Sequence, residues 1–158
     1  MKKYGVLFVC TGNICRSPTA DGVLRKMVVD HGLAAVVEVD SAGTHDYHVG
    51  EAPDGRSQEH ALKRGYDLSA LRARQVHPHD FERFDLMLAL DDGHLRILQR
   101  LCPPQNKGRI HRFTEFCTRH KTLEVPDPYY GGTQGFEHVL DLVEDGCEGI
   151  IKHVRRAT

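Results

Sequence analysis

The chain has 158 residues, of which 40% are hydrophobic and 27% are charged, and these values are typical of one globular domain with its own core. Its formal net charge of −1 at pH 7 indicates no basic surface for a nucleic acid, so we expect no nucleic-acid partner. Arg72 and Arg74 are expected on solvated faces rather than in a binding patch. The apolar runs are too short to span a bilayer, so we expect no membrane insertion.

Strands and helices are predicted in alternation along the chain. Apolar runs bounded by polar residues, glycine or proline predict four strands, at residues 4–9, 36–43, 84–90 and 109–113. Helical spacing and helix start and stop signals predict helices that begin at Pro18, cover residues 57–63, form a turn at 80–83, run from Asp91 or Asp92 to Leu101, and begin again near Thr133 or Gln134. This alternation predicts an α/β fold, a single-domain three-layer sandwich over residues 1–158 with a four-stranded parallel sheet and helices on both faces.

The segment between the first strand and the first helix carries the pattern C-x5-R-S. Cys10 lies at the end of the strand, and Arg16 and Ser17 lie at the start of the helix. We expect Ser17 to be the N-cap and Pro18 to be the first helical residue. Backbone N–H groups at a helix N-terminus are unpaired and the helix dipole is positive there, so this loop is a ready-made anion site.

The side chains of this loop predict which anion it holds. Gly12 and Asn13 tolerate backbone angles that let successive N–H groups converge, and the planar fork of Arg16 can clamp two oxygens. The N–H groups and Arg16 should also favour the thiolate of Cys10, which is then a competent nucleophile near neutral pH. The loop therefore predicts a phosphate held against a nucleophilic sulfur. The loop residues expected to contact that phosphate are Thr11, Gly12, Asn13, Ile14, Cys15 and Ser17.

Other interpretations of these motifs fit the sequence less well. The loop lacks the G-x4-G-K-[ST] of a nucleotide P-loop and the G-x-G-x-x-G of a dinucleotide-binding fold. Cys10 and Cys15 have no second close pair that would complete a zinc site, and His77 and His79 have no carboxylate or cysteine at a recognised spacing. We therefore expect neither a metal nor a cofactor.

A second candidate for catalysis is Asp127, which lies between Pro126 and Pro128. The prolines stiffen the backbone and push Asp127 to an extended conformation, so a loop presents its carboxyl group. Asp-Pro is also common in ordinary surface turns, and the segment alone favours that interpretation. In the same chain as the cysteine loop, it favours a general acid that protonates the leaving oxygen of a phosphate ester.

Four segments, spread over most of the chain, follow the order of one small enzyme family: VCTGNICRSPTA at 9–20, DSAGTHDYHVGEAPDGR at 40–56, ARQ at 73–75 and DPYYGG at 127–132. The sequence resembles the low-molecular-weight protein tyrosine phosphatases. This resemblance implies an enzyme that hydrolyses phosphotyrosine in proteins, or small aryl phosphates, through a phosphocysteine intermediate. It implies Cys10 as the nucleophile, Arg16 as the phosphate clamp and Asp127 as the general acid and base.

The resemblance also implies residues that support the loop. Ser17 is implied to steady the thiolate, and Asn13 and Ser41 are implied to hold the loop in shape through hydrogen bonds. One position departs from the family pattern: Leu71 stands where the family often has a histidine that helps to hold the loop asparagine. We therefore expect the hydrogen bonds around this loop to be partly different.

The sequence leaves more than one substrate possible. Tyr47 and Tyr129 are implied to line the walls around an aromatic ring, which favours phosphotyrosine. Thr11 keeps a protein-arginine phosphatase possible, because some members of the superfamily with that activity have threonine after the nucleophile. A thiol-dependent arsenate reductase on the same scaffold would need a resolving cysteine pair in mid-chain, and no cysteine lies between Cys15 and Cys102. A non-catalytic phosphate-binding module is disfavoured because the nucleophile, the clamp and the acid are all retained.

The chain has five cysteines, an odd number that suits a reducing compartment better than a disulfide framework. The start MKKYGVLFVC lacks the cleavage pattern of a signal peptide, so we expect a cytoplasmic enzyme, and we expect a monomer. Cys102, Cys117 and Cys147 are expected to pack. Cys15 shares the loop with Cys10, and together with the resemblance this predicts redox regulation, in which peroxide inactivates the enzyme reversibly through a Cys10–Cys15 disulfide.

Overall fold

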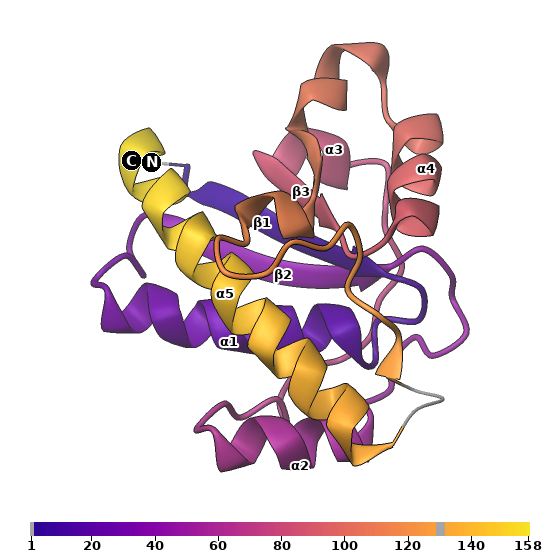
Figure 1. Ribbon diagram of the computed structural model, residues 1–158. Helices are drawn as coiled ribbons and strands as arrows, with labels where there is room; N and C mark the ends of the chain where they lie inside the picture. Colours follow the sequence, from indigo (N-terminus) through magenta and orange to yellow (C-terminus); the bar gives the residue numbers. More distant parts are fainter. Residues whose placement is uncertain (1, 129–131) are drawn as a thin grey trace.

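Four parallel strands form the middle layer of the protein (Figure 1). The computed structural model describes residues 2–128 and 132–158. The strands are β1 (Tyr4–Cys10), β2 (Val37–Gly43), β3 (Leu86–Ala89) and β4 (Ile110–Arg112), in the order β2-β1-β3-β4. β1 therefore lies inside the sheet and pairs with β2 and β3, and its carboxyl end at Cys10 lies opposite Gly43 of β2.

Helices cover both faces of this sheet (Figure 1). α1 (Arg16–Asp30) and α5 (Thr133–Ala157) pack together on one face, and α2 (Gly55–Lys63) packs against α5. α3 (Asp80–Arg83) and α4 (Asp92–Leu101) lie on the other face, and the 3-10 helices η1 (Pro104–Arg109) and η2 (Phe113–Phe116) flank β4. The predicted three-layer α/β fold with a four-stranded parallel sheet is thus confirmed. In the described part of the chain, no helix combines the length and the apolarity needed to cross a membrane.

The central position of β1 explains its uninterrupted apolar sequence. Val6 and Phe8 belong to the core under α1 and α5, whereas Leu7 and Val9 belong to the core under α3 and α4. All four side chains are fully buried. A strand that is covered on both faces needs apolar residues at every position. Cys10 is the last residue of this strand and therefore lies at the carboxyl end of the sheet.

The start of α1 differs from the prediction. The helix begins at Arg16 with Cys15 as its N-cap, so the expectations that Ser17 caps it and that Pro18 opens it are wrong. The Ser17 hydroxyl is instead engaged by the side chains of Cys10 and Asn13. Pro18 lies in the first turn, where an N–H group has no intrahelical partner and its absence costs nothing.

Other element boundaries shift by a few residues. α2 begins at Gly55, two residues early, because the carboxylate of Asp54 accepts hydrogen bonds from two N–H groups of its first turn. β3 and β4 are shorter than predicted, since Phe84 is the C-cap of α3 and Phe113 already belongs to η2. Of the two predicted caps of α4, Asp91 is the one used, and its side chain accepts from the first turn.

A buried carboxylate on α5 anchors the segment that leads toward Asp127. Asp145 is fully buried and accepts hydrogen bonds from the backbone N–H groups of Thr118, Arg119 and His120 at 2.9, 3.0 and 2.9 Å. The ring Nδ1 of His120 lies 2.8 Å from the same carboxylate. Burial alone would raise the pKa of Asp145, but the backbone N–H groups of Thr118, Arg119 and His120 and the ring of His120 outweigh burial and lower that pKa well below its usual range.

We expect Asp145→Asn to lower the free energy of unfolding by roughly 2–3 kcal/mol at pH 7, because a neutral amide is a poorer acceptor for the buried N–H groups. The carboxylate contributes stability above the unfolded pKa of about 4, and this contribution is lost as the pH falls through the lower folded pKa. Urea unfolding at several pH values should therefore show the two proteins converging below about pH 4. Asp30→Asn, at an exposed position of α1, is the control, and a difference that stays constant with pH would contradict the assignment.

Candidate active site

A cavity of about 230 Å³ opens at the carboxyl edge of the sheet, where β1 ends and α1 begins. Its walls come from the cysteine loop, from the segment after β2 and from the loop before α5. The lining residues are Cys10, Thr11, Gly12, Ile14, Cys15, Arg16, Tyr47, His48 and Asp127. Most of the predicted site residues are thus brought together, Asn13, Ser17 and Ser41 are buried outside this lining set, and Tyr129 lies outside the described residues.

The shape of the cysteine loop depends on Asn13. Its backbone is left-handed, with φ of 59°, and its side chain is 2% exposed. Its Nδ2 donates to the hydroxyls of Ser17 and Ser41 at 2.8 and 3.0 Å, and its Oδ1 accepts from the backbone N–H of Arg74 at 3.0 Å. Leu71 instead packs against the core. The asparagine amide is therefore held on both sides without a histidine at position 71.

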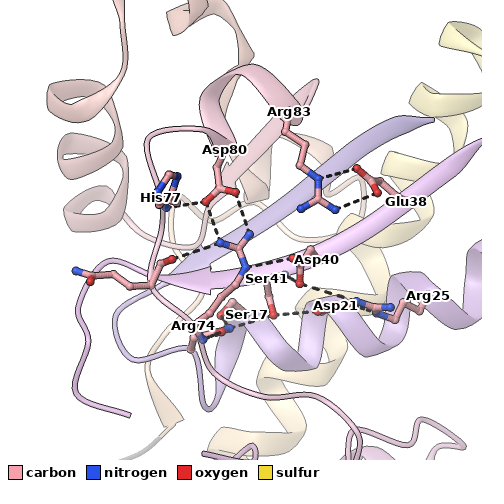
Figure 2. A network of polar contacts seen from close by, with 12 residues as sticks. Ser17, Asp21, Arg25, Glu38, Asp40, Ser41, Arg74, His77, Asp80 and Arg83 are labelled. Carbon is pink, nitrogen blue, oxygen red and sulfur yellow. Dashed lines mark hydrogen bonds and ion pairs between the residues drawn. The ribbon is translucent and has the colours of Figure 1, made fainter. Parts of the chain in front are cut away.

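Polar contacts continue outward from the loop along β2 and α1 (Figure 2). The hydroxyl of Ser41 donates to Asp21 at 2.9 Å. The guanidinium of Arg74 donates to Asp40 at 3.2 Å and to both oxygens of Asp80 at 2.9 and 3.1 Å. Arg74 is therefore half-buried in an ion-pair network, which corrects the expectation that it lies on a solvated face.

Two hydrogen-bond donors, both from Ser17, lie close to the sulfur of Cys10. Cys10 is 3% exposed, and its Sγ is 2.9 Å from the Ser17 hydroxyl and 3.4 Å from the Ser17 backbone nitrogen. Because the Ser17 oxygen already accepts from Asn13, its own proton can point at the sulfur. Two donors to one sulfur stabilise a thiolate. Cys15 differs, since burial and the nearby Asp54 carboxylate raise the pKa of its thiol to about 12.

Two residues that do not line the cavity, Asp91 and Val125, hold the guanidinium of Arg16 in place. Arg16 is 4% exposed, and its Nη1 donates to Asp91 Oδ2 at 2.8 Å and to the carbonyl of Val125 at 3.1 Å. Its Nη2 lies 3.7 Å from Asp127 Oδ2. Val125 is itself tied to the end of β3, because its N–H donates to the Leu90 carbonyl at 2.8 Å. The same short segment thus fixes the arginine and carries the predicted acid.

Aromatic and imidazole side chains form the outer wall. Tyr47 is 69% exposed and stacks on His45, with ring centroids 5.0 Å apart and an interplanar angle of 15°. His48 lies against Gly12 so closely that a Cβ at that glycine would come within 2.9 Å of the imidazole ring. A side chain at position 12 would therefore have to push the His48 ring aside.

Sequence reasoning missed three residues of the site, namely His48, Asp91 and His94. Thr11 Oγ1 lies 2.8 Å from His94 Nε2, and Asp91 holds Arg16. Asp91 did give a signal, because it follows a buried strand and ligands of parallel sheets bind at strand carboxyl ends. His48 and His94 gave none of their own, since neither belongs to a recognised spacing.

Over residues 2–128 and 132–158, no group of three or more histidine, cysteine, aspartate or glutamate side chains is arranged to hold a metal ion. All five cysteines are free thiols. Cys102 and Cys147 are buried, and Cys117 is partly buried against the core.

Comparison with known proteins places the chain in a family. Residues 5–158 match the family model described as low molecular weight phosphotyrosine protein phosphatase. A low molecular weight protein-tyrosine-phosphatase of Streptomyces coelicolor is 48% identical over 155 residues, which cover 96% of this chain and 94% of the relative. A protein tyrosine phosphatase of Entamoeba histolytica, crystallised with Hepes in its active site, is 42% identical with a TM-score of 0.95, covering 98% of this chain and 99% of that one. An arginine phosphatase from Drosophila is 31% identical with a TM-score of 0.87, covering 98% of both chains. The chain therefore belongs to the low molecular weight phosphotyrosine protein phosphatase family.

Proposed function

We propose that the protein hydrolyses phosphotyrosine in proteins, or small aryl phosphates, through a phosphocysteine at Cys10. The observation that supports this most directly is the Cys10 sulfur under two donors in the cavity that Arg16 and Asp127 also line. A thiolate stabilised by such donors is a nucleophile, and a guanidinium in the same cavity can bind the phosphoryl oxygens.

The proposed reaction has two steps. The Cys10 thiolate attacks phosphorus, the bond to the aryl oxygen breaks, and Asp127 in its acid form gives that oxygen a proton. Asp127, now a carboxylate, takes a proton from water as the water oxygen attacks phosphorus and the S–P bond breaks. The N–H groups of the loop and the Arg16 guanidinium stabilise the equatorial oxygens in both steps.

Two substrates are supported by separate observations. The exposed ring of Tyr47, stacked on His45 at the cavity wall, supports an aromatic substrate. Thr11 in the wall, together with the likeness to the Drosophila arginine phosphatase, supports phosphoarginine as the second candidate. We favour phosphotyrosine because the wall offers a ring to stack against.

Turnover of matched peptides that carry phosphotyrosine, phosphoserine or phosphoarginine tests this choice. We expect kcat/KM for phosphotyrosine to exceed the other two by about 100-fold, because only its ring can stack on the wall. Cys10→Ser should lose turnover by about 10⁴-fold while still binding the peptide, since Arg16 and the loop N–H groups remain. A preference for phosphoarginine would make the second candidate correct, and retained hydrolysis by Cys10→Ser would rule out the phosphocysteine.

Asp127→Asn should slow the hydrolysis of phenyl phosphate by about 10²–10⁴-fold, because a basic leaving oxygen depends on the proton of a general acid. An ester with a strongly acidic nitrophenol should be affected far less in single-turnover measurements. Asp46→Asn, an exposed carboxylate on the loop that carries Tyr47, is the matched control. Equal losses on both esters would remove Asp127 from the acid role.

We also propose that Cys15 protects Cys10 during oxidation. Peroxide oxidises the Cys10 thiolate to a sulfenic acid, and the Cys15 thiol then displaces water to form a disulfide that a thiol reductant reopens. The high pKa of Cys15 supports this order, because a protonated thiol reacts slowly with peroxide.

After peroxide and then reductant, the parent should regain most of its activity, whereas Cys15→Ala should stay largely inactive because its sulfenic acid oxidises further. Cys102→Ala, a buried thiol away from the cavity, is the control and should recover like the parent. Equal recovery of Cys15→Ala and the parent would show that Cys15 has no protective role.

A further inference from the structure

His94, in the first turn of α4, lies directly behind the cysteine loop without lining the cavity. Its side chain is 4% exposed. Its Nε2 lies 2.8 Å from Thr11 Oγ1 and 3.5 Å from Arg16 Nη2. Its Nδ1 is buried without a well-formed hydrogen bond among the described residues, and lies 3.2 Å from Asp91 Oδ1. A buried ring thus contacts two residues of the phosphate site from outside it.

The neighbours of the ring determine which nitrogen carries its proton. A guanidinium can only donate, so the Nε2 that faces Arg16 must accept. The proton of a neutral ring is then on Nδ1, on the side of the Asp91 carboxylate. With Nε2 as acceptor, the Thr11 hydroxyl is the donor in their contact. Burial and the nearby Arg16 lower the pKa of His94 to about 4, which agrees with a neutral ring at neutral pH.

The same turn of α4 therefore holds the guanidinium at two points. Asp91 accepts from Nη1 of Arg16 at 2.8 Å, and His94 faces Nη2. Asp91 is fixed in turn, because its Oδ1 accepts from the backbone N–H of His94 at 2.9 Å. Asp91 and the Val125 carbonyl accept only from Nη1, whereas His94 contacts Nη2, so His94 adds a second point that sets the orientation of the guanidinium plane.

We propose that His94 is a positioning residue for phosphate binding, which acts through Arg16 and Thr11. Its neutral Nε2 holds the Arg16 guanidinium plane from the Nη2 side and accepts a hydrogen bond from the Thr11 hydroxyl. Thr11 then presents no hydroxyl donor to the substrate while this contact is made. The inference rests on the proposed function, because it concerns how the same cavity binds a phosphoryl group.

Two amide variants separate this role from a purely structural one. The side-chain amide of His94→Gln reaches the position of Nε2, so its oxygen can accept from Arg16 and Thr11. The amide of His94→Asn is one carbon shorter and reaches only the position of Nδ1. The two variants are alike in polarity and differ in the one contact that matters. His138→Gln, at an exposed position of α5, is the control.

We expect His94→Asn to weaken the binding of inorganic phosphate, measured by calorimetry, by about 10-fold, and to lower kcat/KM for an aryl phosphate by about 10²-fold, as a misplaced clamp does. His94→Gln should stay within about 3-fold of the parent in both. Equal behaviour of the two variants, whether both match the parent or both are impaired in proportion to a lower melting temperature, would overturn the proposal.

Nitrogen NMR of the parent labelled at histidine gives a second, independent readout. The His94 ring should be neutral at pH 7 with its proton on Nδ1, and a proton on Nε2 would overturn the proposal. Phosphate binding and the NMR measurement need no turnover. If the parent failed to hydrolyse aryl phosphates but these two results held, the proposed function would fall and the role of His94 would stand.

Discussion

The site depends on the side-chain amide of one residue in a left-handed conformation. Asn13 turns the chain so that the loop curls, and its amide ties that turn to Ser17, to Ser41 at the end of β2 and to the backbone of Arg74. A non-glycine residue in this conformation is strained, and the three hydrogen bonds offset that cost. The hydrogen bond from Asn13 to Ser17 also affects Cys10, the proposed nucleophile, because it leaves the Ser17 proton to point at the Cys10 sulfur. The shape of the loop and the contacts to the Cys10 sulfur thus depend on one hydrogen-bond network.

The parallel sheet explains why distant parts of the chain meet at this loop. β1, β2 and β3 point the same way, so the residues that follow them gather at one edge. The cysteine loop follows β1, Ser41 lies in β2, and β3 is followed by Asp91, the N-cap of α4. The arginine that closes the loop is therefore clamped by a different βα unit from the one that carries it. Such a clamp requires β1 and β3 to be paired.

Local features were predictable from the sequence, and most contacts between elements were not. The four apolar runs and the C-x5-R loop are readable in short windows, because burial on both faces and an anion site at a helix start are local properties. The capping role predicted for Ser17 was wrong, because its hydroxyl contacts the sulfur of Cys10, seven residues earlier, instead of a backbone N–H group of the helix. Arg74 and His94 were missed because their partners depend on which strands are neighbours, which no spacing in the sequence records.

The proposed nucleophile and the proposed acid differ in burial, and this difference fits the chemistry proposed for each. Cys10 and Arg16 stand between a central strand and a fifteen-residue helix, both buried, so the sulfur and the guanidinium keep one geometry. The side chain of Asp127 is 40% exposed, on a segment held by Val125 on one side and by the Asp145 anchor further back. A phosphate clamp must be preorganised, whereas a group that protonates a leaving oxygen and then deprotonates water has to serve two positions in turn.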